Sequence, residues 1–171
     1  GKKLVVFFYG YSYEFAQHVL GPANSGHLGL GRLLASAEGS IDILAGPSAY
    51  TDRGWCGAAP VMSCAETIQR HGVLWLNEDD VRTNLDRDRK SRTNEGDRLD
   101  ARQMRDVAVR NLAQEMIRGF GCWWMDFPGR GWYDGDELWE IQKVLAPFEN
   151  LFLARTRPFT PEIAAVTDEE T

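Results

Sequence analysis

The stretch that decides the fold is GVLWLNEDD, Gly72–Asp80, in which an apolar run ends abruptly in three carboxylates. Runs that are apolar at nearly every position are typical of strands buried on both faces of a parallel sheet. We therefore predict a strand over Gly72–Glu78. Three other segments share the pattern: Lys3–Tyr11, Ile41–Tyr50 and Gly121–Phe127.

Segments with helical periodicity lie between and after the predicted strands. They cover Ser25–Ser36, Ser63–Gly72, Asp100–Gly121 and Gly135–Leu151. In the second segment, Ser63 is expected to cap the amino end, with Glu66 at the capping-box position. In the last one, Pro147 is expected to end or kink the helix. The third is the clearest, since one apolar stripe runs along it: Met104, Val107, Ala108, Leu112 and Met116.

Strands that alternate with helices predict an α/β fold with parallel strands and right-handed crossovers. Four such units can form a small open sheet or half of an eight-stranded barrel. The chain has 171 residues and a net charge of −6, which argues against general nucleic-acid binding. No stretch has the roughly 20 apolar residues of a membrane helix. The chain begins directly with strand-like residues, so we expect it to be a piece of a longer protein.

In parallel α/β folds, the chemistry gathers at the carboxyl ends of the strands. Here those ends carry aromatic residues, carboxylates and arginines, a mixture that suits a sugar. They include Tyr11, Tyr50, Arg53, Trp123, Trp124, Asp126 and Trp132. A phosphate site would instead show a glycine-rich turn after a strand, whereas the glycines of Gly26–Gly31 lie within a helical pattern. The three cysteines and three histidines lack ligand spacing, so we expect no metal or other cofactor.

Glu78 is the candidate catalytic residue. Strand alternation puts Leu74, Leu76 and Glu78 on one face, so the carboxylate would project into the barrel if that face points inward. Cleavage of a glycosidic bond needs one carboxylate at the anomeric carbon and a second, protonated one at the leaving group. The acidic cluster could equally be an N-terminal cap for the next helix, and the residues alone leave both interpretations open.

Three stretches together resemble the carboxyl-terminal half of a β-galactosidase-type glycoside hydrolase barrel, similar to glycoside hydrolase family 42. They are LWLNEDDVRTNL, GCWWMDFPGRGWYDGDELWE and NSGHLGLGRLLAS followed by IDILAGPSAYTDRG. The resemblance spans about Lys3 to Phe152 and implies strands five to eight of a retaining (β/α)8 barrel, with outer helices. It also implies that Glu78 is the nucleophile and that Tyr50 hydrogen-bonds it. Trp123 or Trp124 would floor the sugar subsite, and Asp126, Arg53 and Tyr11 would contact its hydroxyl groups.

The resemblance also sets expectations for the organisation of the chain. Residues 1–157 would be the half barrel, and residues 158–171 the start of a trimerisation-like domain with a short strand over Glu162–Val166. The acid/base residue belongs to strand four, which this chain lacks, so we expect little hydrolysis from it alone. The open core would be closed by the missing half or by a second copy, which favours a homo-oligomer.

Two other functions stay open at this stage. One is a carbohydrate-binding barrel without catalysis. The other is a metal-dependent barrel hydrolase or lyase that uses Glu78, Asp79 and Asp80. The sequence decides neither the sugar and its linkage nor the cellular location.

Overall fold

The protein is an α/β structure with one parallel sheet, as the alternation of strands and helices predicts. The computed structural model describes residues 4–8, 27–50, 52–86, 99–126, 131–154 and 162–166. Its strands are β1 (Val6–Phe8), β2 (Ile43–Pro47), β3 (Leu74–Asp79) and β4 (Gly121–Trp124), and all neighbours pair in parallel. The helices are α2 (Leu30–Ser36), α3 (Ala65–Arg70), α4 (Ala101–Arg118) and α5 (Glu137–Ala154).

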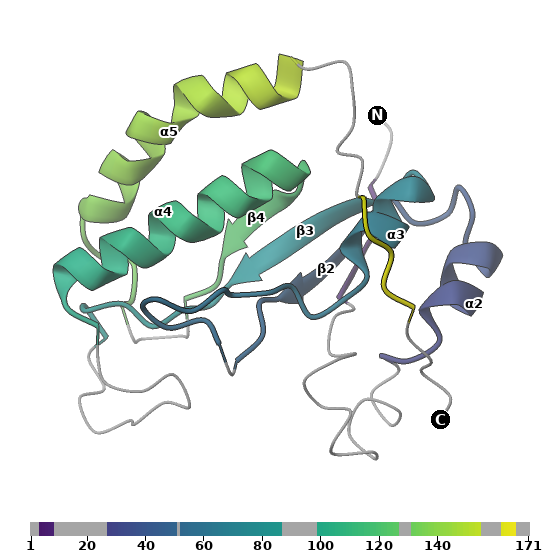
Figure 1. Cartoon of the computed structure of the whole chain (residues 1–171), viewed down its shortest axis with the longest axis horizontal. Coiled ribbons are helices and arrows are strands. Elements are labelled where there is room, and N and C mark those ends of the chain that lie inside the picture. The colour runs from purple at the N-terminus through teal and green to yellow at the C-terminus, as the bar shows by residue number, and fades with distance from the viewer. Residues whose placement is uncertain are drawn as a thin grey trace.

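The strands lie in the sheet in chain order, β1-β2-β3-β4 (Figure 1). Each crossover therefore moves one strand further in the same direction, and right-handed crossovers of that kind place their helices on one face. A doubly wound sheet, in contrast, reverses direction and carries helices on both faces. The described part of the chain thus has one helical layer packed on one side of a sheet.

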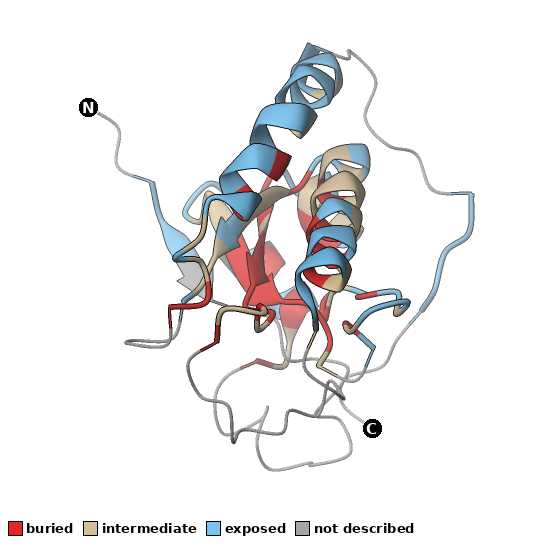
Figure 2. Cartoon of the chain, turned by 90° about the vertical axis from the view of Figure 1, so that its left-hand side faces the viewer, coloured by how far each residue is buried: buried red, intermediate tan, exposed pale blue. Residues whose placement is uncertain are grey.

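The packing of the core shows which face the helices cover. Leu44 and Trp75 are register partners, and both lie in a core with residues of α2 and α3. Trp124, the register partner of Asp79, packs on a second core formed by α4 and α5. Figure 2 shows the buried strands behind these two helices, with the second half of α5 exposed. The helices therefore cover the face that carries residues 44, 75, 77, 79 and 124.

The opposite face of the sheet is open at its amino-terminal end. Leu74 is 40% exposed and Val6 52%, while Trp123, at the carboxyl end of the same face, is 37% exposed. This face carries the residues that strand alternation groups with Glu78. Trp75 does not belong to this face, because it points at the helices and is fully buried. We call the surface formed by Val6, Ile43, Leu74, Leu76 and Trp123 the open face.

Two helix ends differ from their predictions. Cys64, not Ser63, is the N-cap of α3, and no side chain caps this end. The capping box expected at Glu66 is thus absent there, because Ser63 is buried one residue too early to bond the helix amides. Pro147 does not end α5, which continues to Ala154. A proline removes one amide donor and can be tolerated where the rest of the helix holds its shape.

α4 begins and ends as its sequence predicts. The Asp100 carboxylate accepts a hydrogen bond from the backbone amide of Gln103, and the Gln103 side-chain oxygen accepts one from the backbone amide of Asp100, a complete capping box. Gly119 ends the helix at a φ of 75°, in the left-handed region that glycine favours. These two caps fix the length of the helix that lies over the end of β3.

The tail does not form the expected strand. Residues 162–166 are described without strand structure, and Ile163 and Val166 are almost fully exposed. A strand needs a partner strand to pair with, and within the described residues the pairing of the sheet does not include this tail. Within the described residues, no helix is long and apolar enough to cross a membrane.

Candidate functional site

Glu78 lies at the carboxyl end of β3, on the face turned away from the helices. Only 4% of its surface is exposed, although the same face is open further back at Leu74. Burial raises the pKa of Glu78 to about 7, with Asp80 raising it further and Arg53 lowering it. The carboxyl group can therefore change its protonation state near neutral pH.

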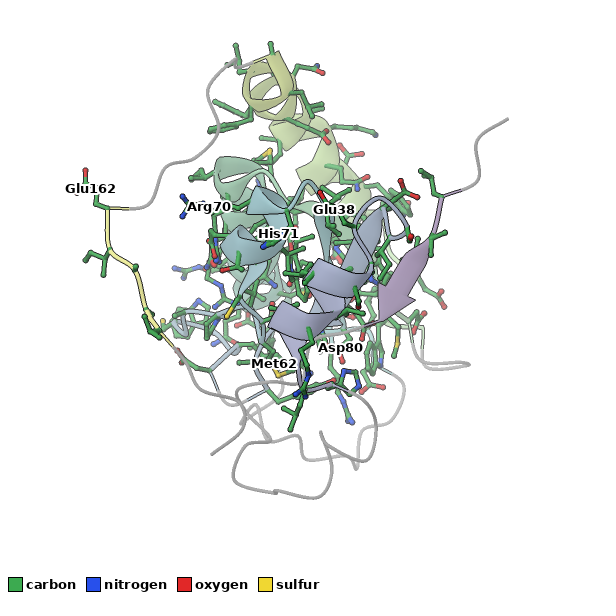
Figure 3. All side chains as sticks on the ribbon, turned by 90° about the vertical axis from the view of Figure 1, so that its right-hand side faces the viewer. Glu38, Met62, Arg70, His71, Asp80 and Glu162 are labelled. Carbon is green, nitrogen blue, oxygen red and sulfur yellow. The ribbon has the colours of Figure 1, made fainter. Side chains whose placement is uncertain are left out.

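Asp80 is the hub of the polar residues around Glu78. It forms a buried ion pair with Arg53, and the hydroxyl of Tyr50 donates to its second oxygen over 3.2 Å. The guanidinium of Arg53 also stacks on the Tyr50 ring, 4.1 Å from the centroid. Figure 3 shows Asp80 at one end of the sheet, with Arg70 and His71 near the other. Two of the predicted substrate-binding residues, Tyr50 and Arg53, thus meet beside the predicted nucleophile.

The two tryptophans at the end of β4 point to opposite faces. Trp123 is the register partner of Glu78 and shares its face, where about a third of its surface is exposed. Trp124 lies on the helical face, with its ring centroid 6.1 Å from that of Tyr133 and 5.9 Å from that of Trp139. Of the two candidates for a sugar floor, only Trp123 lies beside Glu78. Trp124 belongs to the packing under α4 and α5, because alternation turns neighbouring side chains to opposite sides.

The other predicted contact residues have structural partners here. The carboxylate of Asp126 accepts a hydrogen bond from the amide of Trp132 over 3.2 Å. Trp132 is buried, accepts a hydrogen bond from Thr83 through its carbonyl, and has Arg82 over its ring at 5.7 Å. Asp126 and Trp132 therefore both make contacts within the protein itself. Tyr11 lies outside the described residues.

Asn77 and Asp79, on either side of Glu78, point into the helical layer and bond to α4. The side-chain amide of Asn77 donates to the Glu115 carboxyl group over 2.9 Å and to the Ser48 hydroxyl over 3.1 Å. Asp79 accepts a hydrogen bond from Asn111 over 3.0 Å. Sequence reasoning missed Asn111 and Glu115, although their signal is visible: both fall on the buried side of a helix whose other buried residues are apolar.

These buried carboxyl groups are electrostatically unusual. Burial raises the pKa of Glu115 to about 8, with Asp79 raising it further, while hydrogen bonds from Cys122 and Asn77 lower it. Burial also raises the pKa of Asp79, which the bond from Asn111 opposes. A pKa near 8 leaves Glu115 mostly protonated at pH 7, so that Asn77 donates mainly to an uncharged carboxyl group.

The loop between β2 and α3 is tied to α4 by one arginine. Arg110 donates to the carbonyls of Gly54 and Gly57 over 2.7 Å each and to that of Arg53 over 2.8 Å. Two residues of this loop, Cys56 and Ala59, have positive φ values of 67° and 45°, which side-chain-bearing residues rarely adopt. The guanidinium thus holds a strained turn that begins at Arg53.

The three carboxylates of the acidic cluster do not converge on one point. Glu78 faces away from the helices, Asp79 faces α4, and Asp80 is paired with Arg53 and Tyr50. A divalent cation needs several oxygen ligands directed at one position. Among the described residues, no group of three or more acidic, histidine or cysteine side chains is arranged to hold a metal ion.

No known protein family, curated protein or solved structure matches this chain.

Proposed function

We propose that the chain forms part of a retaining glycoside hydrolase, of the β-galactosidase-like type, in which Glu78 is the nucleophile. The observation that carries the proposal is the position of Glu78: a buried carboxylate at the carboxyl end of a parallel strand, facing away from the helices. Trp123 lies next to it on the same face and offers an aromatic surface for a sugar ring. Tyr50, Arg53 and Asp80 supply donors and acceptors for the hydroxyl groups.

The architecture favours a segment of a (β/α)8 barrel. Consecutive parallel strands in sequential order, with helices on one side, are what four neighbouring βα units of such a barrel contain. In a complete barrel the open face would line the interior, which side chains fill. We propose that a further half barrel, or a second copy of this chain, covers that face and supplies the acid/base carboxyl.

In this mechanism, ionised Glu78 attacks the anomeric carbon while the second carboxyl group protonates the departing oxygen. Water then releases the sugar from Glu78. Retention places the two carboxyl groups about 5 Å apart. The raised pKa of Glu78 would also suit a proton donor. The pH dependence of the reaction rate therefore distinguishes a nucleophile from a proton donor.

A covalent trap tests the nucleophile directly. A 2-deoxy-2-fluoroglycosyl fluoride needs no acid: the Glu78 oxygen bonds to the anomeric carbon as the carbon–fluorine bond breaks and fluoride departs. We expect the protein, as its gene encodes it, to gain one fluorosugar on the tryptic peptide His71–Arg82. The label should be absent from Glu78→Gln and unchanged in Glu66→Gln, whose side chain pairs with Arg118 in the helical layer.

The pH dependence of trapping separates the two roles. A nucleophile reacts as the carboxylate, so the labelling rate should rise as the pH increases through about 7. A proton donor acts as the neutral acid, so its contribution would fall over the same range. A panel of galactosyl, glucosyl and mannosyl fluorides would identify the sugar. Failure of every one to label Glu78 would overturn the proposal.

A further inference from the structure

α4 carries two buried polar residues where its apolar stripe faces the end of β3. Asn111 and Glu115 lie four residues apart, so both point the same way from the helix. Each makes one hydrogen bond to the strand: Asn111 to Asp79 over 3.0 Å and Glu115 to Asn77 over 2.9 Å. A leucine at either position would fill the core without the cost of burying a polar group.

The two bonds bracket Glu78 on the strand. Residues 77 and 79 point to the helices, and residue 78 between them points to the site. Fixing the side chains on both sides fixes the peptide units that lead into and out of Glu78. The hydroxyl of Tyr133 adds a third bond, to the Asp79 carbonyl over 2.8 Å. Rotation or translation of the Glu78 backbone would thus break bonds on the far side of the sheet.

The same helix holds the residues that face the Glu78 carboxylate. Arg110, beside Asn111, binds the turn that begins at Arg53, and Arg53 pairs with Asp80. Arg110 also donates to the Asn111 side-chain oxygen over 2.8 Å, which leaves the Asn111 amide group directed at Asp79. Consecutive residues of α4 therefore reach both the strand of Glu78 and the loop of its charged neighbours.

We propose that Asn111 and Glu115 are positioning residues, which act through Asp79 and Asn77 to hold Glu78 at the site. The inference rests on the proposed function only in taking Glu78 as the reacting group. It assigns a role to residues on the face opposite the sugar, where they touch no substrate. Burying the polar side chains of Asn111 and Glu115 lowers stability. On this proposal, the two residues are buried because they fix the position of the Glu78 carboxylate.

Two buried carboxyl groups matter for the test, those of Glu78 and Glu115, and each has charged or titratable neighbours. Glu78 faces Asp80 and Arg53, and Glu115 faces Asp79 and Cys122. Glu115→Gln keeps an uncharged acceptor for Asn77 and should preserve the position of Glu78. Glu115→Leu removes the acceptor. Asn111→Asp keeps the shape but loses the donor to Asp79 whenever its carboxyl is ionised.

Two measurements on these variants test the role. The first is the titration of the Glu78 side-chain carbon by NMR in protein labelled with ¹³C at glutamate, which needs no turnover. The second is the rate of trapping by the 2-fluoroglycosyl fluoride. Val107→Ala is the matched control, because Val107 is buried on the same side of α4 and its side chain has no polar atom. We expect this variant to lower the stability of the protein and to leave the hydrogen bonds of Asn111 and Glu115 to β3 in place.

In Glu115→Leu and in Asn111→Asp, we expect the Glu78 midpoint to fall from about 7 toward the ordinary value of 4.5, as water reaches a less constrained carboxylate. Trapping should slow by about a hundredfold, the usual effect of a misplacement near 1 Å. Glu115→Gln and Val107→Ala should keep the parental midpoint.

The outcomes separate this inference from the proposed function. Unchanged Glu78 midpoints in both Glu115→Leu and Asn111→Asp, or an equal change in Val107→Ala, would overturn the positioning role. If the parent protein is never labelled, but its Glu78 midpoint responds to Asn111→Asp and not to Val107→Ala, the positioning role stands. The nucleophile assignment then fails.

Discussion

Glu78 is ionisable and buried, and the charged groups that act on it are an arginine and an aspartate. Leaving a carboxylate in such a place costs stability, because the charged form loses its hydration. A glutamine of the same shape would avoid that cost. The residue is therefore best explained by what its carboxylate does.

Glu78→Gln should abolish turnover and trapping while leaving the fold intact. Because burial raises the Glu78 pKa, the parental protein loses stability as the pH rises from the ordinary 4.5 to about 7, and the variant lacks that loss. Chemical denaturation above pH 7 should find the variant at least as stable as the parent. A variant that retained full turnover would contradict the catalytic assignment.

Glu115→Gln tests the second buried carboxyl group in the same way. The folded protein holds Glu115 protonated up to about pH 8, whereas the unfolded chain releases the proton near 4.5. The parental free energy of unfolding therefore falls across that window, by at most about 1.4 kcal/mol for each pH unit. We expect a shallower fall in Glu115→Gln between about pH 5 and about pH 8.

The control for this measurement is Glu149→Gln, a change at an exposed glutamate of α5. Its pH dependence should follow the parent. Equal slopes in the parent and in Glu115→Gln would mean that Glu115 is ionised in the folded protein, and the uncharged hydrogen bond to Asn77 would be wrong.

At the scale of elements, the sequence predicted the sheet well and the polar side of α4 poorly. The strands could be recognised because parallel strands are apolar on both faces, as at Leu74–Leu76. Alternation then predicted that Glu78 and Asp79 point in opposite directions, which the structure confirms. Asn111 and Glu115 were missed because a periodic pattern records which positions are apolar. Such a pattern does not show that a polar residue on the apolar stripe lies against the end of a strand and forms hydrogen bonds with it.

The choice between Trp123 and Trp124 shows a second limit. Both lie at the end of the same strand, and only the register against β3 tells which one shares a face with Glu78. Register depends on the hydrogen bonds between strands and on the packing of the whole sheet, so it could not be read from the strand itself. The same holds for Trp75, whose direction follows from the helices that cover it.

Arg110 is the link between α4 and the loop that carries Arg53. Arg110→Lys keeps the charge but replaces a planar group that binds three carbonyls with a single ammonium. We expect a loss of about 1–3 kcal/mol in the free energy of unfolding, since hydrogen bonds from a charged donor are lost in a partly buried place. Hydrogen exchange should also quicken at the amides of Gly57 and Ala59, which bond within this loop.

Arg102→Lys is the matched control, because Arg102 is an exposed arginine on the first turn of the same helix. It should leave both the stability and the exchange rates of the loop unchanged. Slow exchange of the loop amides in Arg110→Lys would show that the turn holds itself without the arginine.

At the scale of the whole molecule, the described residues include two apolar surfaces that are candidate sites of association. One is the open face of the sheet, which includes Leu74 and Trp123. The other is the second half of α5, where Val144, Phe148 and Leu151 are all more than half exposed. Contiguous exposed apolar surface of this kind marks an interface. If the chain is a segment of a barrel, we expect the open face to be the main site of association, because the interior of a barrel is a packed core.

Leu74→Lys and Val144→Lys distinguish these surfaces, since each places one charge on one of them. We expect the parent chain to self-associate or to bind a hydrophobic dye, and Leu74→Lys to weaken both much more than Val144→Lys does. Light scattering coupled to size-exclusion chromatography, over a range of concentrations, measures the association. A parent chain that stays monomeric and binds no dye would contradict the half-barrel proposal, because four βα units that hide their inner face unaided form a complete domain. A stronger effect of Val144→Lys would instead place the interface on α5 and leave the sheet face as a solvated surface.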